Sequence, residues 1–290
     1  MSTSITTLIS DAIKVWPLYC LPKHFLSSLI YKLTRIENKA WKNFLIKQFI
    51  AFYKIDMEQA ICSNAEDYAS FNAFFTRNLK PDARNNKQDS KLILSPVDGF
   101  ISQIGNIDEG RLIQAKGKKY NLSSLLANDA SASQFKSGSF TTLYLSPRDY
   151  HRIHMPVSGK LIRSLYVPGD LFPVNTASVR TVDRLFARNE RFISLFETEF
   201  GLMAQIMVGA IFVGSMDTVW LGQITPTKNR EINIKEYEDA TIKLNQTDEF
   251  GHFNMGSTVI LLFEEDKLNW LDDLKENDAI QVGQILANCK

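Results

Sequence analysis

The chain has 290 residues, of which 44% are hydrophobic and 22% charged, and its formal net charge is +1. This length suits one large domain or two smaller ones with a sizeable core. A net charge so close to zero gives no overall field that would attract nucleic acid, so we expect no nucleic-acid partner. The charge is unevenly distributed, however, because residues 1–55 carry +6 and the remainder −5. This segregation favours an anionic surface as partner of the first segment.

The three cysteines, at positions 20, 62 and 289, are widely spaced and form no C-x-x-C pair. This arrangement argues against a disulfide framework or a zinc site and is typical of a reducing compartment. No charged segment followed by an apolar one opens the sequence, as it would in a signal peptide. The longest apolar run, residues 206–214, is shorter than the roughly 20 residues that cross a bilayer. We therefore expect a soluble or peripheral protein made in the cytosol.

Residues 11–60 have helical periodicity. Apolar side chains recur at spacings of one, three and four from Phe25 to Ile36 and again from Trp41 to Phe52, with lysines beside them. Such faces usually form core. The alternative is a pair of interfacial helices whose aromatic faces enter a lipid surface while the lysines meet anionic head groups. The abundance of Trp and Phe beside lysine favours this second interpretation.

From Leu92 onward the pattern changes to short β-like runs separated by glycine-containing turns, including runs at 202–213 and 258–263. A polar linker at residues 80–90 precedes this change. The predicted fold class is therefore α+β: N-terminal amphipathic helices in a membrane-associating region, residues 1–80, followed by a mostly antiparallel β sandwich or barrel. This catalytic domain spans residues 91–290 and carries helical pieces at 122–128 and 175–186.

The stretch GHFNMGSTVILLF, residues 251–263, places a polar turn directly before a β-branched and aromatic run that predicts a buried strand. Gly256 and Ser257 stand at the junction. On the simpler interpretation, Ser257 caps the turn. On the chemical interpretation, its hydroxyl attacks the carbonyl carbon of Gly256, since a glycine leaves the backbone free and the strand holds the serine still. That attack needs a base elsewhere in the chain.

Two motifs offer partners for such a serine. Asp98 in SPVDG stands between a proline-stiffened segment and a glycine, where an aspartate usually stabilises a turn. The motif SPRDYHRIHMP contains His151 and His154, which would face the same way on a helical turn. The pair could ligate a metal, although no third ligand is near in sequence; it could be hydrogen-bonded and structural; or it could be catalytic. Asp98, His154 and Ser257 together supply an orienting acid, a base and a nucleophile. No G-x-S-x-G elbow is present, which disfavours a conventional hydrolase.

The combination SPVDG, YLSPRDYHRIHMP, YVPGDLFPVN, LFARNERF, TEFGLMAQIMVGAIFVGS and FNMGSTVILLF resembles phosphatidylserine decarboxylase of the bacterial and mitochondrial pyruvoyl-dependent type. The similarity runs from about residue 21 to residue 287. The cleavage signature of that family is usually Leu-Gly-Ser-Thr, whereas this chain has Met255 in the first position. Methionine keeps the volume and polarity of leucine closely enough that we expect processing to survive.

The resemblance implies a zymogen. By analogy, Asp98 orients His154, and His154 takes the proton of Ser257, which attacks Gly256. An acyl shift from nitrogen to oxygen forms an ester, and β-elimination then releases the chain that ends at Gly256. Hydrolysis of the resulting dehydroalanine leaves a pyruvoyl group, which is the cofactor that the resemblance implies; no metal is expected.

The expected products are a β chain, residues 1–256, and an α chain, residues 257–290, that begins with the pyruvoyl group. The resemblance implies that this ketone forms a Schiff base with the amine of phosphatidylserine and accepts the electrons released with CO₂. His151 is the candidate for the proton transfer that completes phosphatidylethanolamine. Tyr144 is a candidate for lining the head-group pocket.

The expected partners are phosphatidylserine in an anionic membrane, the two chains of one precursor and, in a homodimer, a second copy. The expected location is peripheral, on the cytoplasmic face of the inner or cell membrane. Two alternatives stay open from the sequence. A pyruvoyl decarboxylase of a soluble amino acid would share the cleavage chemistry but would not use a basic amphipathic N-terminus. A non-enzymatic membrane-docking module would keep an inert Gly-Ser turn.

Overall fold

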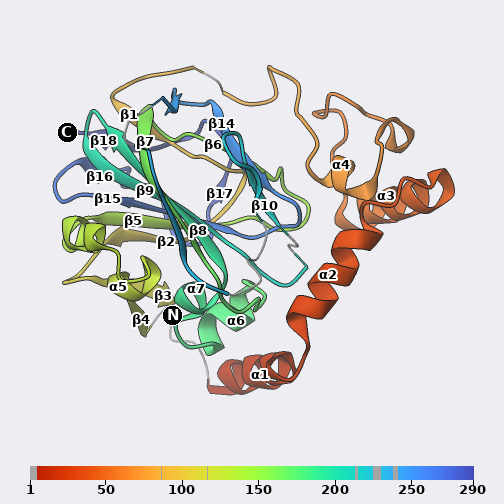
Figure 1. The fold of residues 1–290 in the computed structure, drawn as a ribbon, viewed down its shortest axis with the longest axis horizontal. Helices are drawn as coiled ribbons and strands as arrows, with labels where there is room; N and C mark the ends of the chain where they lie inside the picture. The colour runs from red at the N-terminus through yellow and green to blue at the C-terminus, as the bar shows by residue number, and fades with distance from the viewer. Residues whose placement is uncertain (1–4, 86, 116, 213–214, 225–229, 238–240) are drawn as a thin grey trace.

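The computed structural model describes residues 5–85, 87–115, 117–212, 215–224, 230–237 and 241–290. Helices occupy the first part of the chain and form an arm beside and beneath the strands (Figure 1). None of the helices in these ranges is long and apolar enough to cross a bilayer. The helical elements of the arm are α1 (Ile5–Val15), the 3₁₀ helix η1 (Trp16–Tyr19), α2 (Lys23–Leu33), α3 (Lys39–Tyr53), the 3₁₀ helix η2 (Ala65–Asp67) and α4 (Phe71–Phe75).

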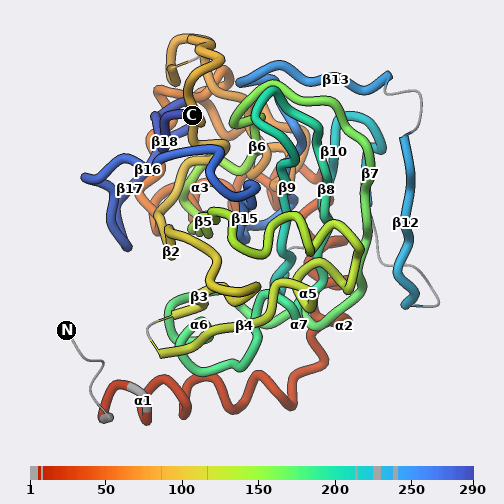
Figure 2. Tube along the Cα trace, turned by 90° about the vertical axis from the view of Figure 1, so that its left-hand side faces the viewer, coloured from red at the N-terminus to blue at the C-terminus, as the bar shows by residue number. Residues whose placement is uncertain are grey.

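The largest sheet is antiparallel throughout. Its strands, in spatial order, are β12 (Asn233–Glu236), β7 (Gly159–Val167), β8 (Arg191–Thr198), β9 (Gly201–Val208), β15 (Thr258–Phe263), β5 (Ser139–Tyr144), β2 (Gly99–Asn106) and β17 (Ala279–Ile280), with β13 (Lys243–Leu244) also paired to β7. In Figure 2 its strands lie side by side across the molecule, from β2 on the left to β12 on the right.

Smaller antiparallel sheets and short helices surround it. One sheet has the order β11 (Gly222–Ile224), β10 (Met216–Thr218), β14 (Glu249–Phe253) and β6 (Arg152–His154). A second has the order β1 (Leu92–Leu94), β18 (Ile285–Cys289) and β16 (Leu268–Trp270), and β3 (Arg111–Ala115) pairs with β4 (Lys118–Asn121). The short helices are α5 (Leu122–Leu125), η3 (Ala130–Phe135), α6 (Thr176–Thr181) and α7 (Leu185–Arg188).

Strand β15 lies at the centre of the large sheet. All six of its residues are buried, and it pairs with β9 on one side and β5 on the other. A strand whose two faces are both buried in the protein needs apolar side chains at consecutive positions. The sequence from position 259 to 263 accordingly has no polar residue. The predicted buried strand is confirmed, and Ser257 immediately precedes it.

Helices α3 and α4 share a hydrophobic cluster of their own. Its buried members include Ile46 from α3 and three phenylalanines from α4 and its start, Phe71, Phe74 and Phe75. Met255, next to the predicted cleavage site, packs against this cluster. The side-chain amide of Asn72 also donates to the side-chain oxygen of Asn254 at 2.9 Å. The helical arm is thus attached directly to the loop that carries Gly256 and Ser257.

The α+β class and the antiparallel strands are confirmed, but the barrel alternative is wrong. Among the described strands, the path of the large sheet has two ends, β12 and β17, that do not pair with each other. The strand expected at 202–213 ends earlier, at Val208, and one further ladder-like hydrogen bond follows it, from the N–H of Gly209 to the carbonyl of Glu190. Residues 213 and 214 lie outside the described part. The piece expected at 175–186 is two helices, separated by Arg184 with a left-handed φ of 51°.

Candidate active site

Ser257 lies between the loop after β14 and the first residue of β15. Its backbone carbonyl accepts a hydrogen bond from the N–H of Leu145 at 2.8 Å. Its side chain is fully buried, and its Oγ has no hydrogen-bond partner among the residues that the structure describes. A serine that capped the turn would use this hydroxyl, and a buried hydroxyl without a partner costs free energy. The geometry therefore favours the chemical interpretation of Ser257 over the structural one.

The imidazole of His151 lies against Gly256. A Cβ built on Gly256 would be 2.7 Å from Nε2 of His151, so a larger residue there would force one of the two to move. On its other side, the ring of His151 packs on Phe75 with a centroid separation of 4.1 Å. Glycine at position 256 thus allows an imidazole to approach the peptide bond that is expected to break.

His151 is held as a neutral group. Its side chain is fully buried, and neither ring nitrogen has a hydrogen-bond partner in the described part of the chain. Burial, reinforced by the positive charge of Arg77, lowers the pKa of His151 to about 3. A neutral imidazole with a free lone pair can accept a proton, and it is placed beside the bond where a proton must be moved.

His154 lies in a different environment, where both of its ring nitrogens are engaged. Nδ1 is 2.8 Å from the backbone oxygen of Thr247, and Nε2 is 3.1 Å from the hydroxyl of Tyr150. Because a carbonyl can only accept, Nδ1 carries the proton, and Nε2 accepts from Tyr150. Burial lowers the pKa of His154, so this imidazole is also neutral near pH 7.

The expectation that His151 and His154 face the same way on a helical turn is wrong. Residues 152–154 form strand β6, and side chains three positions apart in an extended chain point to opposite faces. His151 therefore faces Gly256 and Phe75, whereas His154 faces Tyr150. The motif looked helical because a spacing of three suits one helical face, but its prolines and its pairing with β14 keep it extended.

Asp98 is buried beside Arg84. Its carboxylate accepts from Nε of Arg84 at 2.8 and 3.1 Å, from Nη2 of the same arginine, and from the N–H of Val282 at 2.9 Å. No hydrogen bond joins Asp98 to His154 within the described residues, although the negative charge of Asp98 acts to raise the pKa of His154. Arg84 stands in the segment expected to be a polar linker, and no local pattern in the sequence marks it as part of a site.

An apolar cavity opens beside the cleavage loop. Its volume is about 410 Å³, and Gly256, Met255 and Tyr144 form part of its wall. The remaining wall comes from the helical arm and from three loops: Leu18, Leu21, Phe49, Tyr53, Phe75, Leu145, Pro147, Pro173, Val174, Asn175, Ala210, Ile211 and Phe212. Tyr144 is half-buried and its pKa is raised by burial, so its hydroxyl stays protonated. The cavity connects the helical arm with the reacting backbone.

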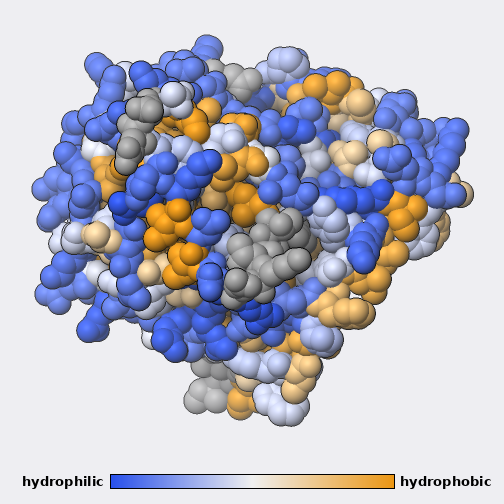
Figure 3. Space-filling model, in the orientation of Figure 1, coloured by the Kyte–Doolittle hydropathy of each residue, from blue (hydrophilic) through white to orange (hydrophobic). Residues whose placement is uncertain are grey.

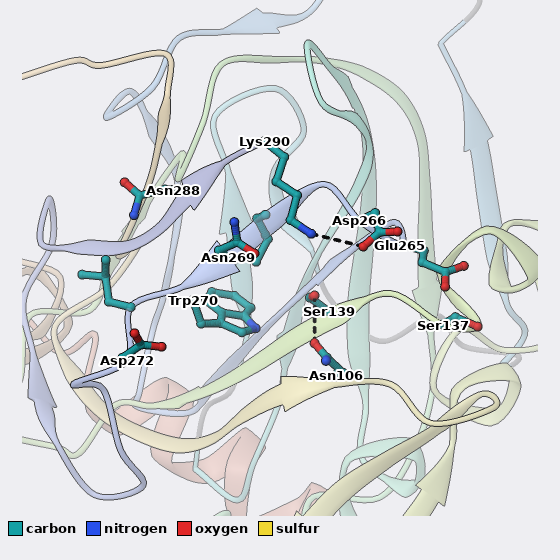
Figure 4. A pocket seen from close by; sticks show the side chains of 12 residues that line it. Asn106, Ser137, Ser139, Glu265, Asp266, Asn269, Trp270, Asp272, Asn288 and Lys290 are labelled. Atoms are coloured by element: carbon teal, nitrogen blue, oxygen red, sulfur yellow. Dashed lines mark hydrogen bonds and ion pairs between the residues drawn. The ribbon is translucent and has the colours of Figure 1, made fainter.

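A larger polar cavity of about 630 Å³ lies at the other end of β15 (Figure 4). Trp270, Asn269 and Asn288 line it, together with Lys290, which is paired with Asp266 at 3.1 Å. Six residue steps along β15 separate this end, at Phe263, from Ser257, which is roughly 20 Å at about 3.4 Å per residue. None of its described lining side chains is a buried group without a partner. Its size alone does not make it the catalytic site.

Comparison with known proteins matches nearly the whole chain to one family. A family model described as phosphatidylserine decarboxylase matches residues 71–288, and one described as PSD matches residues 13–54. The phosphatidylserine decarboxylase proenzyme of Methylococcus capsulatus is 45% identical over 273 residues, which covers 94% of this chain and 95% of that protein. The corresponding proenzyme of Shewanella baltica is 46% identical over 285 residues, covering 97% and 98%.

The chain belongs to the phosphatidylserine decarboxylase family. A member of this family is a lyase of phospholipid biosynthesis that is made as a proenzyme and uses a pyruvoyl group derived from a serine. The residues around Ser257 fit such a group. Ser257 is buried and its Oγ has no described partner, its neighbour Gly256 leaves room for an imidazole, and its carbonyl is held by Leu145.

Proposed function

We propose that this phosphatidylserine decarboxylase cleaves itself between Gly256 and Ser257 into a β chain, residues 1–256, and an α chain, residues 257–290. The observation that carries the proposal is the buried Oγ of Ser257, which has no hydrogen-bond partner among the described residues, at the edge of a rigid strand. The adjacent glycine, with His151 packed against it, supports the same bond. The unpartnered Oγ and the imidazole packed against Gly256 both destabilise the fold slightly, and both have a use if this peptide bond is cleaved.

We assign Ser257 as the nucleophile, His154 as its base and Asp98 as the acid that orients the base. Two observations support this triad: Nε2 of His154 is the unprotonated nitrogen, and the charge of Asp98 favours its protonation. His151 is the competing base, because its Nε2 is the imidazole nitrogen that contacts Gly256. In the assignment that we propose, His151 acts later, in decarboxylation.

Single substitutions separate these roles. Ser257→Ala should remain one full-length chain on a denaturing gel and should not decarboxylate phosphatidylserine. His154→Ala should also remain uncut, whereas His151→Ala should be cut and should then be inactive. If His151→Ala stays uncut and His154→Ala is processed at the normal rate, the base of self-cleavage is His151, and the proposed triad is wrong.

For the decarboxylation itself, the pyruvoyl group at position 257 supplies a ketone that captures the substrate amine and takes up the electrons released with CO₂. Beside this position, the neutral ring of His151 takes a proton from the substrate amine as that amine condenses, and returns it to the carbon that has lost the carboxylate. The apolar cavity of about 410 Å³ accommodates the start of the lipid chains and excludes water. Tyr144 also borders a cavity of about 200 Å³ whose wall includes Gln103 and Arg180, which suits a polar head group.

We propose that residues 1–80 attach the enzyme to an anionic membrane at its cytoplasmic face, and that residues 91–290 form the catalytic domain. Figure 3 shows hydrophobic side chains along the rim formed by α2 and α3. Phe25, Phe44 and Phe52 of these two helices are exposed by 67%, 59% and 80%, and Ile13 of α1 and Trp16 of η1 by 69% and 72%. Exposed lysines accompany them at positions 14, 32, 39, 47 and 54. This pattern is typical of a surface that lies in the lipid interface.

Two lysines of the same segment have another role. Lys23 is buried, donates to the carbonyl of Leu18 and lies 4.2 Å from the ring centroid of Phe172. Lys42 is buried and donates to the carbonyl of Glu66. The net charge of the segment therefore overstates the charge that it presents to a membrane. Assembly into a homodimer stays a prediction, which light scattering of the purified enzyme tests.

A further inference from the structure

Arg77, two residues after α4, is a buried arginine whose donors are mostly unused. Its exposed fraction is 5%, and its Nη2 donates to the carbonyl of Arg148 at 3.3 Å. Its Nε and Nη1 have no hydrogen-bond partner in the described part of the chain. By contrast, the equally buried Arg191 donates all of its N–H-bearing nitrogens to backbone carbonyls. The Cζ of Arg77 lies 5.4 Å from the ring centroid of Phe74, and the charges of Asp98 and Asp149 act on it without forming an ion pair. Buried donors without an acceptor are costly, which indicates that Arg77 has a further partner at another stage.

Several contacts connect the surroundings of Arg77 to the cleavage loop. Asn72 of α4 is hydrogen-bonded to Asn254, two residues before Gly256. Phe75 packs on His151 and shares the wall of the apolar cavity with Gly256. The charge of Arg77 also helps to lower the pKa of His151, so the two groups lie within electrostatic reach. Arg77 therefore lies in the neighbourhood of the loop that carries the expected cleavage site, with Phe75 and His151 between them in this series of contacts.

Self-cleavage creates a carboxylate in this interior. In the acyl shift, the carbonyl carbon of Gly256 passes from the nitrogen of Ser257 to its Oγ. In the elimination, Cα of residue 257 loses a proton and the Cβ–Oγ bond breaks, so that Oγ leaves as one of the two carboxylate oxygens of Gly256. The dehydroalanine that remains takes up water and releases ammonia. A negative charge thus develops on Gly256, where neighbouring side chains are buried.

We infer that Arg77 is the receptor for this carboxylate. Its free donors stabilise the charge as it develops during elimination, and afterwards they hold the C-terminus of the β chain against the α chain by charge-assisted hydrogen bonds. The inference rests on the cleavage site proposed above. It explains why a proenzyme keeps a buried guanidinium with two nitrogens that have no acceptor among the described residues: their acceptor does not exist until the chain is cut.

The serine carboxylate of the substrate is the other source of the same chemistry. We favour Gly256, because the substrate carboxylate is the group that leaves as CO₂. A cation paired with it would stabilise the starting state more than the transition state, in which its charge disappears. The charge of the Gly256 carboxylate instead increases along the elimination, so the same cation lowers that barrier.

The experiment follows newly made proenzyme over time and treats samples with hydroxylamine, which splits an ester but not an amide. For Arg77→Met we expect elimination about 10-fold to 100-fold slower, the usual effect of losing a hydrogen bond to a charged group. A full-length species that hydroxylamine cuts at position 256 should accumulate. Arg77→Lys should restore part of the rate. Arg191→Met, a matched buried arginine, should lower stability without accumulating ester.

The inference is overturned if Arg77→Met is processed at the wild-type rate, or if it folds, stays uncut and resists hydroxylamine. It is also overturned if cleavage is normal but the KM of processed Arg77→Met for phosphatidylserine rises about 10-fold, since the carboxylate is then that of the substrate. If elimination is slowed in Arg77→Met and the KM of the processed variant for phosphatidylserine is unchanged, the carboxylate that Arg77 binds is that of Gly256. Ser257→Ala distinguishes this failure from that of the proposed function: if Ser257→Ala is still cut at the same bond, the cleavage site itself is wrong.

Discussion

The imidazole of His151 and the backbone of Gly256 are in such close contact that position 256 has no room for a Cβ. The built Cβ would be 2.7 Å from Nε2 and 3.3 Å from the carbonyl oxygen of Leu145. The imidazole is also packed on the ring of Phe75, with 4.1 Å between the ring centroids, and is fully buried. The cleavage glycine is therefore required for space, in addition to its conformational freedom.

Gly256→Ala should slow or abolish self-cleavage, because the added methyl displaces either the scissile peptide or His151. The fraction of uncut chain at fixed times on a denaturing gel measures the effect. Gly222→Ala is the control: Gly222 has a φ of +66° in the β10–β11 hairpin, so alanine is strained there without touching the site. Equal processing of Gly256→Ala and the wild type would contradict the contact.

The stability of the uncut protein should depend on pH through His151. Burial lowers its pKa to about 3 from 6.5, so between these values the unfolded chain binds a proton that the folded chain does not. Its contribution is complete above about pH 6.5 and is lost as the pH falls towards 3, by about 1.4 kcal/mol per pH unit. Urea unfolding of Ser257→Ala at pH 5 and 7.5 measures this loss.

The same measurement needs a variant without the imidazole, because burial raises the pKa of Glu190 to about 7. That carboxyl holds a proton in the folded state, so its contribution is complete below pH 4.5 and is lost as the pH rises through 7, opposite to that of His151. In Ser257→Ala/His151→Gln the Glu190 effect is unchanged. The free energy of unfolding of Ser257→Ala, minus that of Ser257→Ala/His151→Gln, should therefore decrease as the pH falls from 7.5 to 5. If this difference does not change with pH, the imidazole is not buried in its neutral form.

Arg84 and Asp98 should behave as a coupled buried pair. Removing either partner leaves the other charge buried, so Arg84→Met should lower the free energy of unfolding by about 3–5 kcal/mol. Arg84→Met/Asp98→Asn should cost clearly less than the two single changes added together. Lys119→Met, at an exposed ion pair, should change stability little. Strict additivity at positions 84 and 98 would show that the pair is not coupled.

The N-terminal helices should mediate binding to vesicles that contain phosphatidylserine. Replacing Trp16, Phe25, Phe44 and Phe52 by serine should abolish co-sedimentation, because these are the most exposed aromatic side chains of the arm. Replacing the exposed Val219, Ile232 and Ile234 of the β region is the matched control and should leave binding intact. Cleavage, which is intramolecular, should proceed in both variants. Unimpaired binding of the first variant would exclude this docking surface.

The sequence was most informative where a local pattern reports a local structure. The run from Val259 to Phe263 is β-branched and aromatic without a polar residue, and only a strand buried on both faces suits it. Ser257 was singled out because a glycine precedes it and this strand follows it. The basic amphipathic helices could also be predicted, since the helical spacing of their apolar residues is found within one continuous segment.

The rest of the site depends on contacts between distant segments. Arg84 comes to Asp98 from the apparent linker, and Arg77 comes to the carbonyl of Arg148 from the end of α4; neither position carries a local pattern. The side of the chain to which each histidine side chain points could not be predicted either, because it depends on whether residues 151–154 are helical or extended. Pairing of β6 with β14 settles that question, and no periodicity within so short a segment reports it.

The intact mass of freshly purified protein, before and after borohydride reduction, tests the central claim most directly. We predict two chains, residues 1–256 ending in a carboxylate and residues 257–290 beginning with a pyruvoyl group in place of Ser257. Reduction should add two hydrogen atoms to the second chain alone. A single unreduced chain of 290 residues that nevertheless decarboxylates phosphatidylserine would contradict the account.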